Sequence, residues 1–361
     1  MTEIMRTHTV ALATFSPRAP NICEDIPTVD LLPPALRPVS RWNITSLVPG
    51  AGSKQLARTI KELAIDVVFC HYATTAVHFR KVWDEVPVPL LIHCHGYDVT
   101  WTKGRLLGLI NSRGPRYQGW LRRLANRALY VANSNFTKSR MTAVGIAERR
   151  IEVKYLGVPV QQFSQTIRKS GSSVEILYLG RFIDCKGPDL TIQAFELACQ
   201  MGLNGRLRMA GGGPMLDHCK TLCERSPFRD RIELLGAVDS ATGEALRRTS
   251  DIFTVHNRIG PTSGQEEAYG VSVVEAMADG LPVVGTRSGG VIETVVDQVT
   301  GFLVTPSSVS EHARALLTLS RSSQLRFNMG KAGHQRAKEL FSEVKEKSRI
   351  EELLERAIAE R

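Results

Sequence analysis

Two acidic residues in the C-terminal half have the spacing of a site for an anionic, hydroxyl-rich ligand. Glu267 and Glu275 stand eight residues apart, the first in a loop and the second on an apolar helix predicted over residues 271–278. The free amides at the start of such a helix favour an anion. A carboxylate repels phosphate, so we expect the two acids to bind hydroxyl groups. The combination predicts a nucleotide-sugar site, although a solvated Glu267 and a Glu275 that caps a helix would be a simpler reading.

Basic and glycine-rich loops follow the predicted strands of the same half. Arg181 and Lys186 stand five residues apart in the loop after a strand predicted over 175–179. The planar fork of Arg and the mobile charge of Lys suit a diphosphate, although two surface bases in a loop are common. Gly212 and Gly213 lie in a loop between a strand and a helix, and Val238 follows the next strand. Glycine runs of this kind are usually simple turns.

The run from Glu267 to Gly290 resembles the E-x7-E signature of retaining glycosyltransferases of the family 4 type, the group 1 family that includes glycogen and sucrose-phosphate synthases. The match continues through Ser288-Gly-Gly-Val-Ile-Glu293. Gly180-Arg181 and Lys186-Gly187 resemble the family's Gly-Arg…Lys-Gly element. The resemblance is strong over residues 171–304, weaker over 66–158 and poor over 1–60. In that last part the loop after the first strand lacks the family's glycines.

The resemblance implies a role for each of these residues. Arg181 and Lys186 would hold the donor diphosphate and stabilise the leaving group, so that no metal ion and no cofactor is needed. Glu267 would bind hydroxyls of the transferred sugar, and Glu275 those of the ribose. Backbone groups of Gly270, Val271, Ser272, Gly212, Gly213 and Val238 would contact the rest of the donor. The departing phosphate oxygen would itself deprotonate the acceptor.

A histidine in the N-terminal half completes the predicted catalytic set. His95 ends a strand predicted over 88–95 and is followed by Gly96-Tyr-Asp98. A lone histidine is more often structural, but the resemblance implies that His95 faces the donor sugar. Cys70-His71 and His93-Cys94-His95 belong to strands predicted over 66–71 and 88–95, which are expected to be neighbours, so they could suggest a metal cluster. Because successive strand residues point to opposite faces, and no fourth ligand has metal spacing, we expect no metal site among them.

The alternation of strands and helices predicts an α/β protein with GT-B architecture, that is, two Rossmann-like doubly wound domains facing a deep interdomain cleft. Residues 1–160 would form the acceptor-binding domain and residues 161–341 the donor-binding domain. A C-terminal helix from about 342 to 361 would pack back on the first domain. Residues 16–42 hold six prolines and are expected to lack regular structure, and residues 43–49 are expected to form a strand.

Charge and composition indicate where the protein works. The chain has 361 residues and seven cysteines without regular spacing, which suit a reducing compartment. It has no run of 18 apolar residues and no signal-peptide pattern at its start, so a cytoplasmic protein is expected. Residues 1–160 hold 21 Lys and Arg against 11 Asp and Glu, whereas the remaining residues hold 25 of each. No acid lies between Asp98 and Glu148, where nine bases are interleaved with Trp101, Tyr117 and Trp120.

Such a basic, aromatic surface suits the inner face of an anionic membrane or a phosphate-linked acceptor, or it is simply a solvated face. No nucleic-acid recognition motif accompanies it. The sequence thus predicts a glycosyltransferase that moves a sugar from a nucleoside-diphosphate sugar to a saccharide or lipid-linked saccharide. A soluble small-molecule acceptor, a phosphorylase with pyridoxal phosphate, an epimerase and a non-catalytic sugar-nucleotide-binding protein are the alternatives.

Overall fold

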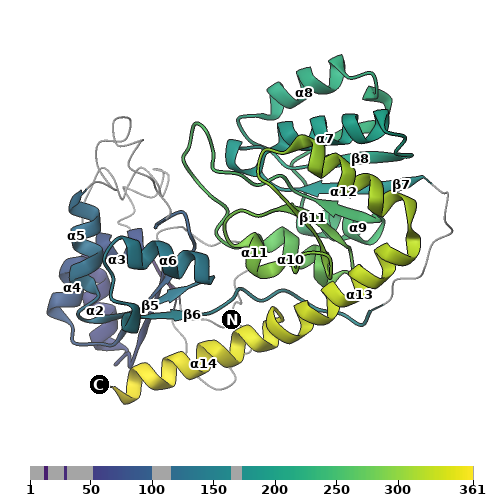
Figure 1. Ribbon diagram of the computed structural model, residues 1–361. Coiled ribbons are helices and arrows are strands. Elements are labelled where there is room, and N and C mark those ends of the chain that lie inside the picture. The colour runs from purple at the N-terminus through teal and green to yellow at the C-terminus, as the bar shows by residue number, and fades with distance from the viewer. Residues whose placement is uncertain (1–11, 15–27, 31–51, 100–114, 164–172, 361) are drawn as a thin grey trace. The chain divides into compact units, whose positions relative to one another are not determined.

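The computed structural model describes residues 12–14, 28–30, 52–99, 115–163 and 173–360. The chain divides into two compact units (Figure 1). Unit 1 comprises the described residues within Met1–Asn133, together with Thr137–Lys154 and Lys347–Arg361. Unit 2 comprises Ser134–Phe136 and Tyr155–Glu346. The chain therefore leaves unit 1 at Lys154 and returns to it after Glu346.

Unit 1 is built on a four-stranded parallel sheet in the order β3-β4-β5-β6. Every residue of the two central strands is buried, as expected for a parallel sheet covered on both faces. The strands are β3 (Val68–His71), β4 (Leu90–Cys94), β5 (Ala128–Ala132) and β6 (Ile151–Val153). The helices are α2 (Ser53–Glu62), α3 (Ala73–His78), α4 (Arg80–Glu85), α5 (Pro115–Leu124) and α6 (Asn135–Ala143), with a 3-10 turn at Glu148–Arg150.

A separate pair of short strands lies near the start of the chain. β1 (Leu12–Thr14) and β2 (Thr28–Asp30) pair in parallel. The expectation that residues 16–42 lack regular structure was therefore wrong at Thr28–Asp30, where three residues between prolines are free to pair as a strand. The strand expected at 43–49 and the glycine-poor loop after β1 lie outside the described residues.

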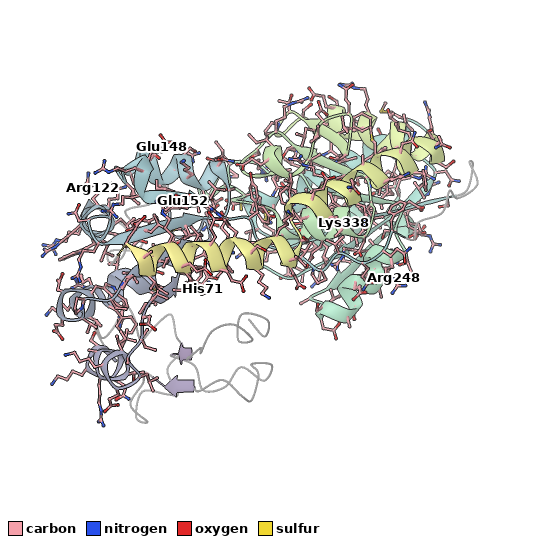
Figure 2. All side chains as sticks on the ribbon, turned by 90° about the horizontal axis from the view of Figure 1, so that it is seen from below. His71, Arg122, Glu148, Glu152, Arg248 and Lys338 are labelled. Carbon is pink, nitrogen blue, oxygen red and sulfur yellow. The ribbon has the colours of Figure 1, made fainter. Side chains whose placement is uncertain are left out.

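The last helix, α14 (Glu343–Ala359), covers one face of the unit 1 sheet. Leu353 and Leu354 are buried against Leu91 of β4 and Leu129 and Val131 of β5. Beside this apolar contact, the Glu152 carboxylate pairs with Arg349 and Arg356, each at 2.7 Å. Figure 2 shows Glu152 next to this helix. Helix α14 thus completes a hydrophobic core whose other buried side chains come from β4 and β5.

Unit 2 is built on a six-stranded parallel sheet in the order β12-β11-β10-β7-β8-β9. When the six strands are numbered in chain order and the sheet is read from β9 to β12, this is the order 3-2-1-4-5-6 of a doubly wound dinucleotide-binding fold. Such sheets bind ligands where the winding reverses, which here is between β7 and β10. The strands are β7 (Val174–Leu179), β8 (Gly205–Ala210), β9 (Ile232–Gly236), β10 (Ile252–Thr254), β11 (Val283–Thr286) and β12 (Gly301–Val304).

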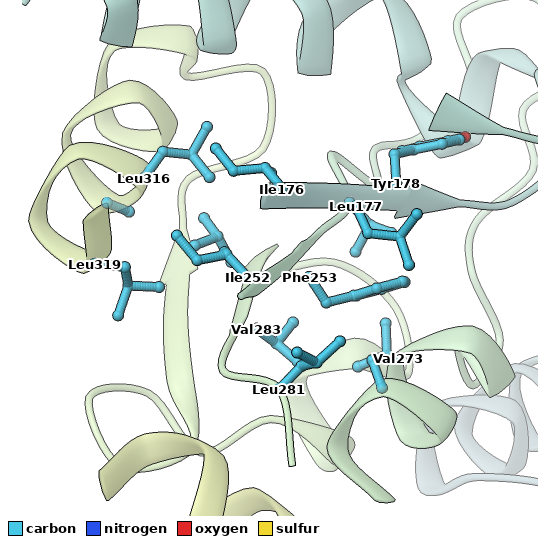
Figure 3. Packing of buried hydrophobic residues seen from close by; sticks show 14 of the residues in the cluster. Ile176, Leu177, Tyr178, Ile252, Phe253, Val273, Leu281, Val283, Leu316 and Leu319 are labelled. Carbon is cyan, nitrogen blue, oxygen red and sulfur yellow. The ribbon is translucent and has the colours of Figure 1, made fainter. Parts of the chain in front are cut away.

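Helices on both faces bury this sheet. Side chains of α12 and α10 pack against those of the strands, as Figure 3 shows for Leu316, Leu319 and Val273. Pro188 starts the first helix, where its missing N–H costs nothing, and Asp239 caps another by accepting the Thr242 amide at 2.8 Å. The helices are α7 (Pro188–Gln200), α8 (Leu216–Arg225), α9 (Ser240–Arg248), α10 (Val271–Ala278), α11 (Val291–Thr294), α12 (Val309–Arg321) and α13 (Ser323–Leu340), with 3-10 turns at Asp184–Lys186 and Arg229–Arg231.

Helix length and hydrophobicity decide whether a helix can span a membrane. Among the described residues, no helix combines the length and the apolar character that crossing a bilayer would require.

The packing of α14 yields a prediction about stability. Leu353→Ala removes a fully buried side chain and should lower the free energy of unfolding of unit 1 by about 2–5 kcal/mol. Ile358→Ala is the matched control, because Ile358 is 38% exposed on the same helix. Urea denaturation followed by circular dichroism measures the first unfolding transition. Equal shifts for the two variants would contradict the packing described.

Candidate functional site

The loops after β7 and β10 meet closely at the reversal of the unit 2 sheet. A Cβ on Gly187, which ends the first loop, would lie 2.2 Å from the backbone oxygen of His256 in the second. Gly187 also has a φ of 57°, which favours glycine. Only glycine allows this approach, and this accounts for the Lys-Gly element of the sequence.

Arg258 and Asp184 fasten the two loops together. The Arg258 amide donates to the Cys185 carbonyl at 3.0 Å, and its guanidinium pairs with Asp189 at 2.9 Å. The Asp184 carboxylate accepts from the amides of Thr262 and Ser263 at 2.8 and 2.6 Å. Polar groups placed by so many bonds hold a fixed geometry, which a binding site requires.

Lys186 and Glu267 form an ion pair where these loops meet. Their side chains are only 16% and 12% exposed. The other oxygen of Glu267 accepts from the Gly270 amide at 3.0 Å, at the start of α10. Burial opposes ionisation of Glu267, but Lys186 and the backbone amides outweigh it and hold the pKa of this carboxyl below its usual value. Glu267 therefore stays ionised at neutral pH.

Two glycines explain the Ser-Gly-Gly part of the motif. A Cβ on Gly289 would lie 1.9 Å from the Glu267 carbonyl oxygen, and one on Gly290 would lie 2.1 Å from that of Ala268. The Gly290 amide donates to the Glu267 carbonyl at 2.8 Å. These glycines let the chain after β11 pack directly on the loop that carries Glu267.

Glu275 pairs with a different base. On α10 it lies 3.1 Å from Arg247 of α9, which also pairs with Asp279 at 2.6 Å. Burial raises the pKa of Glu275, and Asp279 adds to this, while Arg247 opposes it. The two acids of the motif are thus held separately, Glu267 by Lys186 and Glu275 by Arg247.

The loop after β8 packs under the loop that carries Arg181. A Cβ on Gly211 would lie 1.9 Å from the Gly180 carbonyl oxygen, and one on Gly213 would lie 2.5 Å from that of Phe182. Gly212 has open space except for Ala237, 3.7 Å away in the loop after β9. Arg181 is exposed beside them. Gly213 thus has a structural reason to be glycine, whereas Gly212 leaves its backbone accessible.

The remaining residues predicted to contact the donor lie in segments that follow β9 and β10, at the carboxyl ends of the unit 2 strands. Gly270 has a φ of 87° and precedes α10, whose first residues are Val271 and Ser272. Val271 is 40% exposed, unusual for valine in this apolar helix. The first amides of a helix have no partner within it, so this end can accept an oxygen-rich ligand. Val238, half-buried after β9, is next to Ala237 in the chain.

His95 belongs to unit 1, in a cluster of three histidines. His71 of β3 is the register partner of His93 in β4, and His95 follows two residues later. Strand alternation places the three histidines on one face, because they occupy positions of the same parity, and it places Cys70 and Cys94 on the other. The ring nitrogens His71 Nδ1 and His95 Nε2 lie 3.1 Å apart. Burial, with His71 and Lys154 nearby, lowers the pKa of His95 to about 3.

Asp98 fixes the loop that carries His95. Its carboxylate accepts from the His95 amide at 3.1 Å and from the Ala73 amide at 2.8 Å. Asp98 is 1% exposed. The His-Gly-Tyr-Asp run therefore joins the ends of β3 and β4.

The basic surface of unit 1 is less uniform than its sequence suggests. Lys138 pairs with Glu148 at 3.1 Å, and Tyr117 is buried, contrary to the expectation of an exposed aromatic. Arg80 and Arg123 lie over the Trp120 ring, 4.6 and 5.7 Å from its centre. With Arg116 and Gly119 they line a hollow of about 460 Å³, here called the Trp120 hollow. Trp101, Lys103, Arg105 and Arg113 lie outside the described residues.

Sequence reasoning missed several residues that build the unit 2 site. Arg247, Asn257 and Arg258 belong to no motif that the sequence displays. Asn257 is buried and its amide lies 3.4 Å from Glu267. The one signal was position, since Asn257 and Arg258 are polar residues in the loop that follows the buried strand β10. Glu293, which the motif includes, instead accepts from the amides of Asn135 and Phe136 at 2.8 and 2.6 Å.

Comparison with known proteins extends this picture to most of the chain. Residues 4–162 match the model of Glycosyltransferase Family 4, and residues 160–336 match that of Glycosyl transferases group 1. WcaL of Escherichia coli (strain K12), named as a colanic acid biosynthesis glycosyltransferase, is 28% identical over 259 residues, which cover 71% of this chain and 62% of the relative.

A second relative is the GDP-mannose-dependent alpha-(1-6)-phosphatidylinositol monomannoside mannosyltransferase of Mycobacterium tuberculosis (strain CDC 1551 / Oshkosh). It is 27% identical over 256 residues, covering 68% of this chain and 64% of its own. The chain thus matches a little under two thirds of the length of these two relatives. Anabaena Alr3699/HepE, solved in complex with UDP, has the same fold, with a TM-score of 0.70 at 21% identity over 91% of this chain and 86% of its own. The chain belongs to the group 1 glycosyltransferases of the family 4 type and has the GT-B fold, with two α/β units built on parallel sheets.

Proposed function

We propose that this protein is a retaining glycosyltransferase that moves a sugar from a nucleoside-diphosphate sugar to a hydroxyl group, without a metal ion. The observation that carries the proposal is the Lys186–Glu267 pair at the reversal of the unit 2 sheet. A buried ion pair contributes little net stability, so its presence at a ligand-binding position favours a functional role.

The pair suggests how a donor would be bound. The diphosphate would take Lys186, together with exposed Arg181, while sugar hydroxyls would donate to Glu267. Each charge of the free protein would then exchange one partner for another rather than lose it, so binding would leave no buried charge unpaired. Glu275, held by Arg247, would accept from the ribose hydroxyls in the same way.

Charge stabilisation of the leaving diphosphate would be the main catalytic contribution. Two positive side chains, Arg181 and Lys186, neutralise charge that grows as the sugar–phosphate bond breaks. The acceptor oxygen would bond to the anomeric carbon on the face that the diphosphate leaves, which retains the anomeric configuration. The released phosphate oxygen would take the acceptor proton. The role of His95 toward the donor sugar stays a prediction, because His95 belongs to unit 1.

We infer a saccharide or lipid-linked saccharide acceptor, in the synthesis of a cell-surface polysaccharide or glycolipid. The names of the relatives include colanic acid and a phosphatidylinositol mannoside. Among the described residues, the lining of the Trp120 hollow has three arginines and no acidic side chain, which favours a phosphate group or an anionic lipid surface.

The decisive experiment is an assay of the purified chain with UDP-, GDP- and dTDP-sugars and a panel of acceptors. We expect release of one nucleoside diphosphate, a product with the donor's anomeric configuration by NMR, and no loss of rate with EDTA. Inversion at the anomeric carbon would contradict the mechanism, and so would a strict metal requirement. Binding without turnover would favour a non-catalytic protein, and absorbance from a lysine-bound pyridoxal phosphate would favour a phosphorylase.

Lys186→Ala tests the diphosphate contact. It should lower kcat by about 100- to 1,000-fold, because it removes one positive charge that stabilises the leaving group. Lys220→Ala is the matched control, since Lys220 is an exposed lysine paired with Asp217 in the same unit. Thermal melting shows whether the variant stays folded when Glu267 has lost Lys186 as its partner. A folded Lys186→Ala enzyme with normal kcat would remove Lys186 from the mechanism.

The Trp120 hollow predicts binding to anionic lipid. Replacing Arg80, Arg116 and Arg123 together by Gln should weaken binding to phosphatidylglycerol vesicles by about 100-fold at low salt, at roughly 1 kcal/mol per charge. Vesicle co-sedimentation measures this, with phosphatidylcholine vesicles for comparison.

A charge-matched control removes three exposed arginines of unit 2, namely Arg225, Arg229 and Arg248. Its binding should change by much less than that of the unit 1 variant. Equal losses would indicate a diffuse effect of net charge, and indifference to lipid charge would reject the membrane contact.

A further inference from the structure

Three imidazole rings converge in unit 1, at the carboxyl ends of β3 and β4. His71 is the last residue of β3, His93 lies opposite it in β4, and His95 follows that strand. One ring nitrogen from each of the three lies within 4.8 Å of the other two. His71 Nδ1 and His95 Nε2 lie 3.1 Å apart. Figure 2 labels His71, the exposed member of the cluster.

His93 gives a second and independent observation. Its side chain is completely buried, and neither of its ring nitrogens has a hydrogen-bond partner among the described residues. A buried polar atom without a partner costs free energy, and a native protein rarely leaves one without a reason. The neighbouring rings of His71 and His95 lie 5.4 and 4.2 Å from that of His93, centre to centre. A ligand held among the three rings would satisfy the buried nitrogen.

The geometry and the donor set suit a small metal ion. Zinc binds imidazole nitrogens at about 2.0–2.1 Å, so two ligands of a tetrahedral site lie about 3.3 Å apart. The His71–His95 separation is already close to this value. The His93 nitrogen lies within 4.8 Å of the other two, and rotation of its ring would bring it in as the third ligand. Cys70 and Cys94 are next to these histidines in the chain, but they are buried in the opposite packing layer.

We propose that His71, His93 and His95 form a binding site for a divalent transition-metal ion, with zinc as the best match. Three histidines leave a fourth position, which would be open on the side of exposed His71 and available to water or to a ligand oxygen. The ion would join the end of β3 to the loop after β4, the same two segments that Asp98 links through the Ala73 and His95 amides.

Lys154 sets a limit on the affinity. Its side chain is 2% exposed, and its charge acts on both His93 and His95. A positive charge that acts on two of the proposed ligands opposes the binding of a metal cation. Lys154→Met should therefore tighten metal binding by about tenfold or more, as expected for loss of one repulsive charge near a partly buried site.

The proposal does not depend on sugar transfer, because metal binding is measured directly. The purified full chain is freed of metal with a chelator and titrated with Co²⁺, whose visible absorption reports the ligand geometry. We expect one Co²⁺ per chain, with the spectrum of a nitrogen-ligated site, and its displacement by Zn²⁺. Zinc should also raise the melting temperature, since it binds the folded chain.

Ligand variants decide the assignment. His71→Asn and His93→Asn should each weaken Co²⁺ binding by more than about 100-fold, because a lost ligand costs at least as much as a lost outer-shell contact. His218→Asn is the matched control, as His218 is exposed on α8 of unit 2. If His93→Asn fails to fold, His71→Asn still tests the site, because His71 is exposed.

Three results would overturn the proposal. The first is the absence of stoichiometric Co²⁺ binding to the full chain. The second is binding that survives unchanged in folded His71→Asn. The third is a thiolate charge-transfer band, which would move the metal to one of the cysteines.

Discussion

The direct contact between the loops after β7 and β10 is the constraint on which the unit 2 site depends. In a parallel sheet that reverses its winding, the two strands at the reversal send their following loops in opposite directions, and a ligand normally occupies the space. Here the loops touch first, at Gly187 and His256, before they diverge. That contact brings Lys186 to Glu267, although they are 81 residues apart in the chain.

Hydrogen bonds and ion pairs around the contact keep the two loops in place. The Arg258 guanidinium donates to the Asp184 carbonyl and pairs with Asp189, and the Asp184 carboxylate accepts from backbone amides of the second loop, so both side chains support the loops. Gly289 and Gly290 add a third segment on the far side of Glu267. The charged pair therefore lies on a base of backbone hydrogen bonds, which is stiffer than a site made of long side chains alone.

Much of the fold followed from periodicity, because buried parallel strands and their glycine-rich loops leave a clear pattern. The helix predicted at 271–278 matches α10, and the strand predicted at 175–179 matches β7 to within one residue. The partners of the motif residues could not be predicted. Arg247 reaches Glu275 through the packing of α9 near α10, and nothing local to Arg247 signals this. The histidine cluster was considered and set aside because no fourth ligand has metal spacing. That His71 stands opposite His93 depends on the register of the two strands, which only the structure gives.

The course of the chain has a consequence for how the protein is made. Unit 1 begins with the first half of the chain, yet Leu91, Leu129 and Val131 are covered by Leu353 and Leu354 of α14. A ribosome releases the chain from its N-terminus at a limited pace, so these side chains emerge long before their cover is synthesised. During that interval unit 1 has an apolar strip exposed, while unit 2 can already complete its sheet. The order of synthesis and the order of completion are therefore reversed, and chaperone binding during translation should concentrate on the earlier unit.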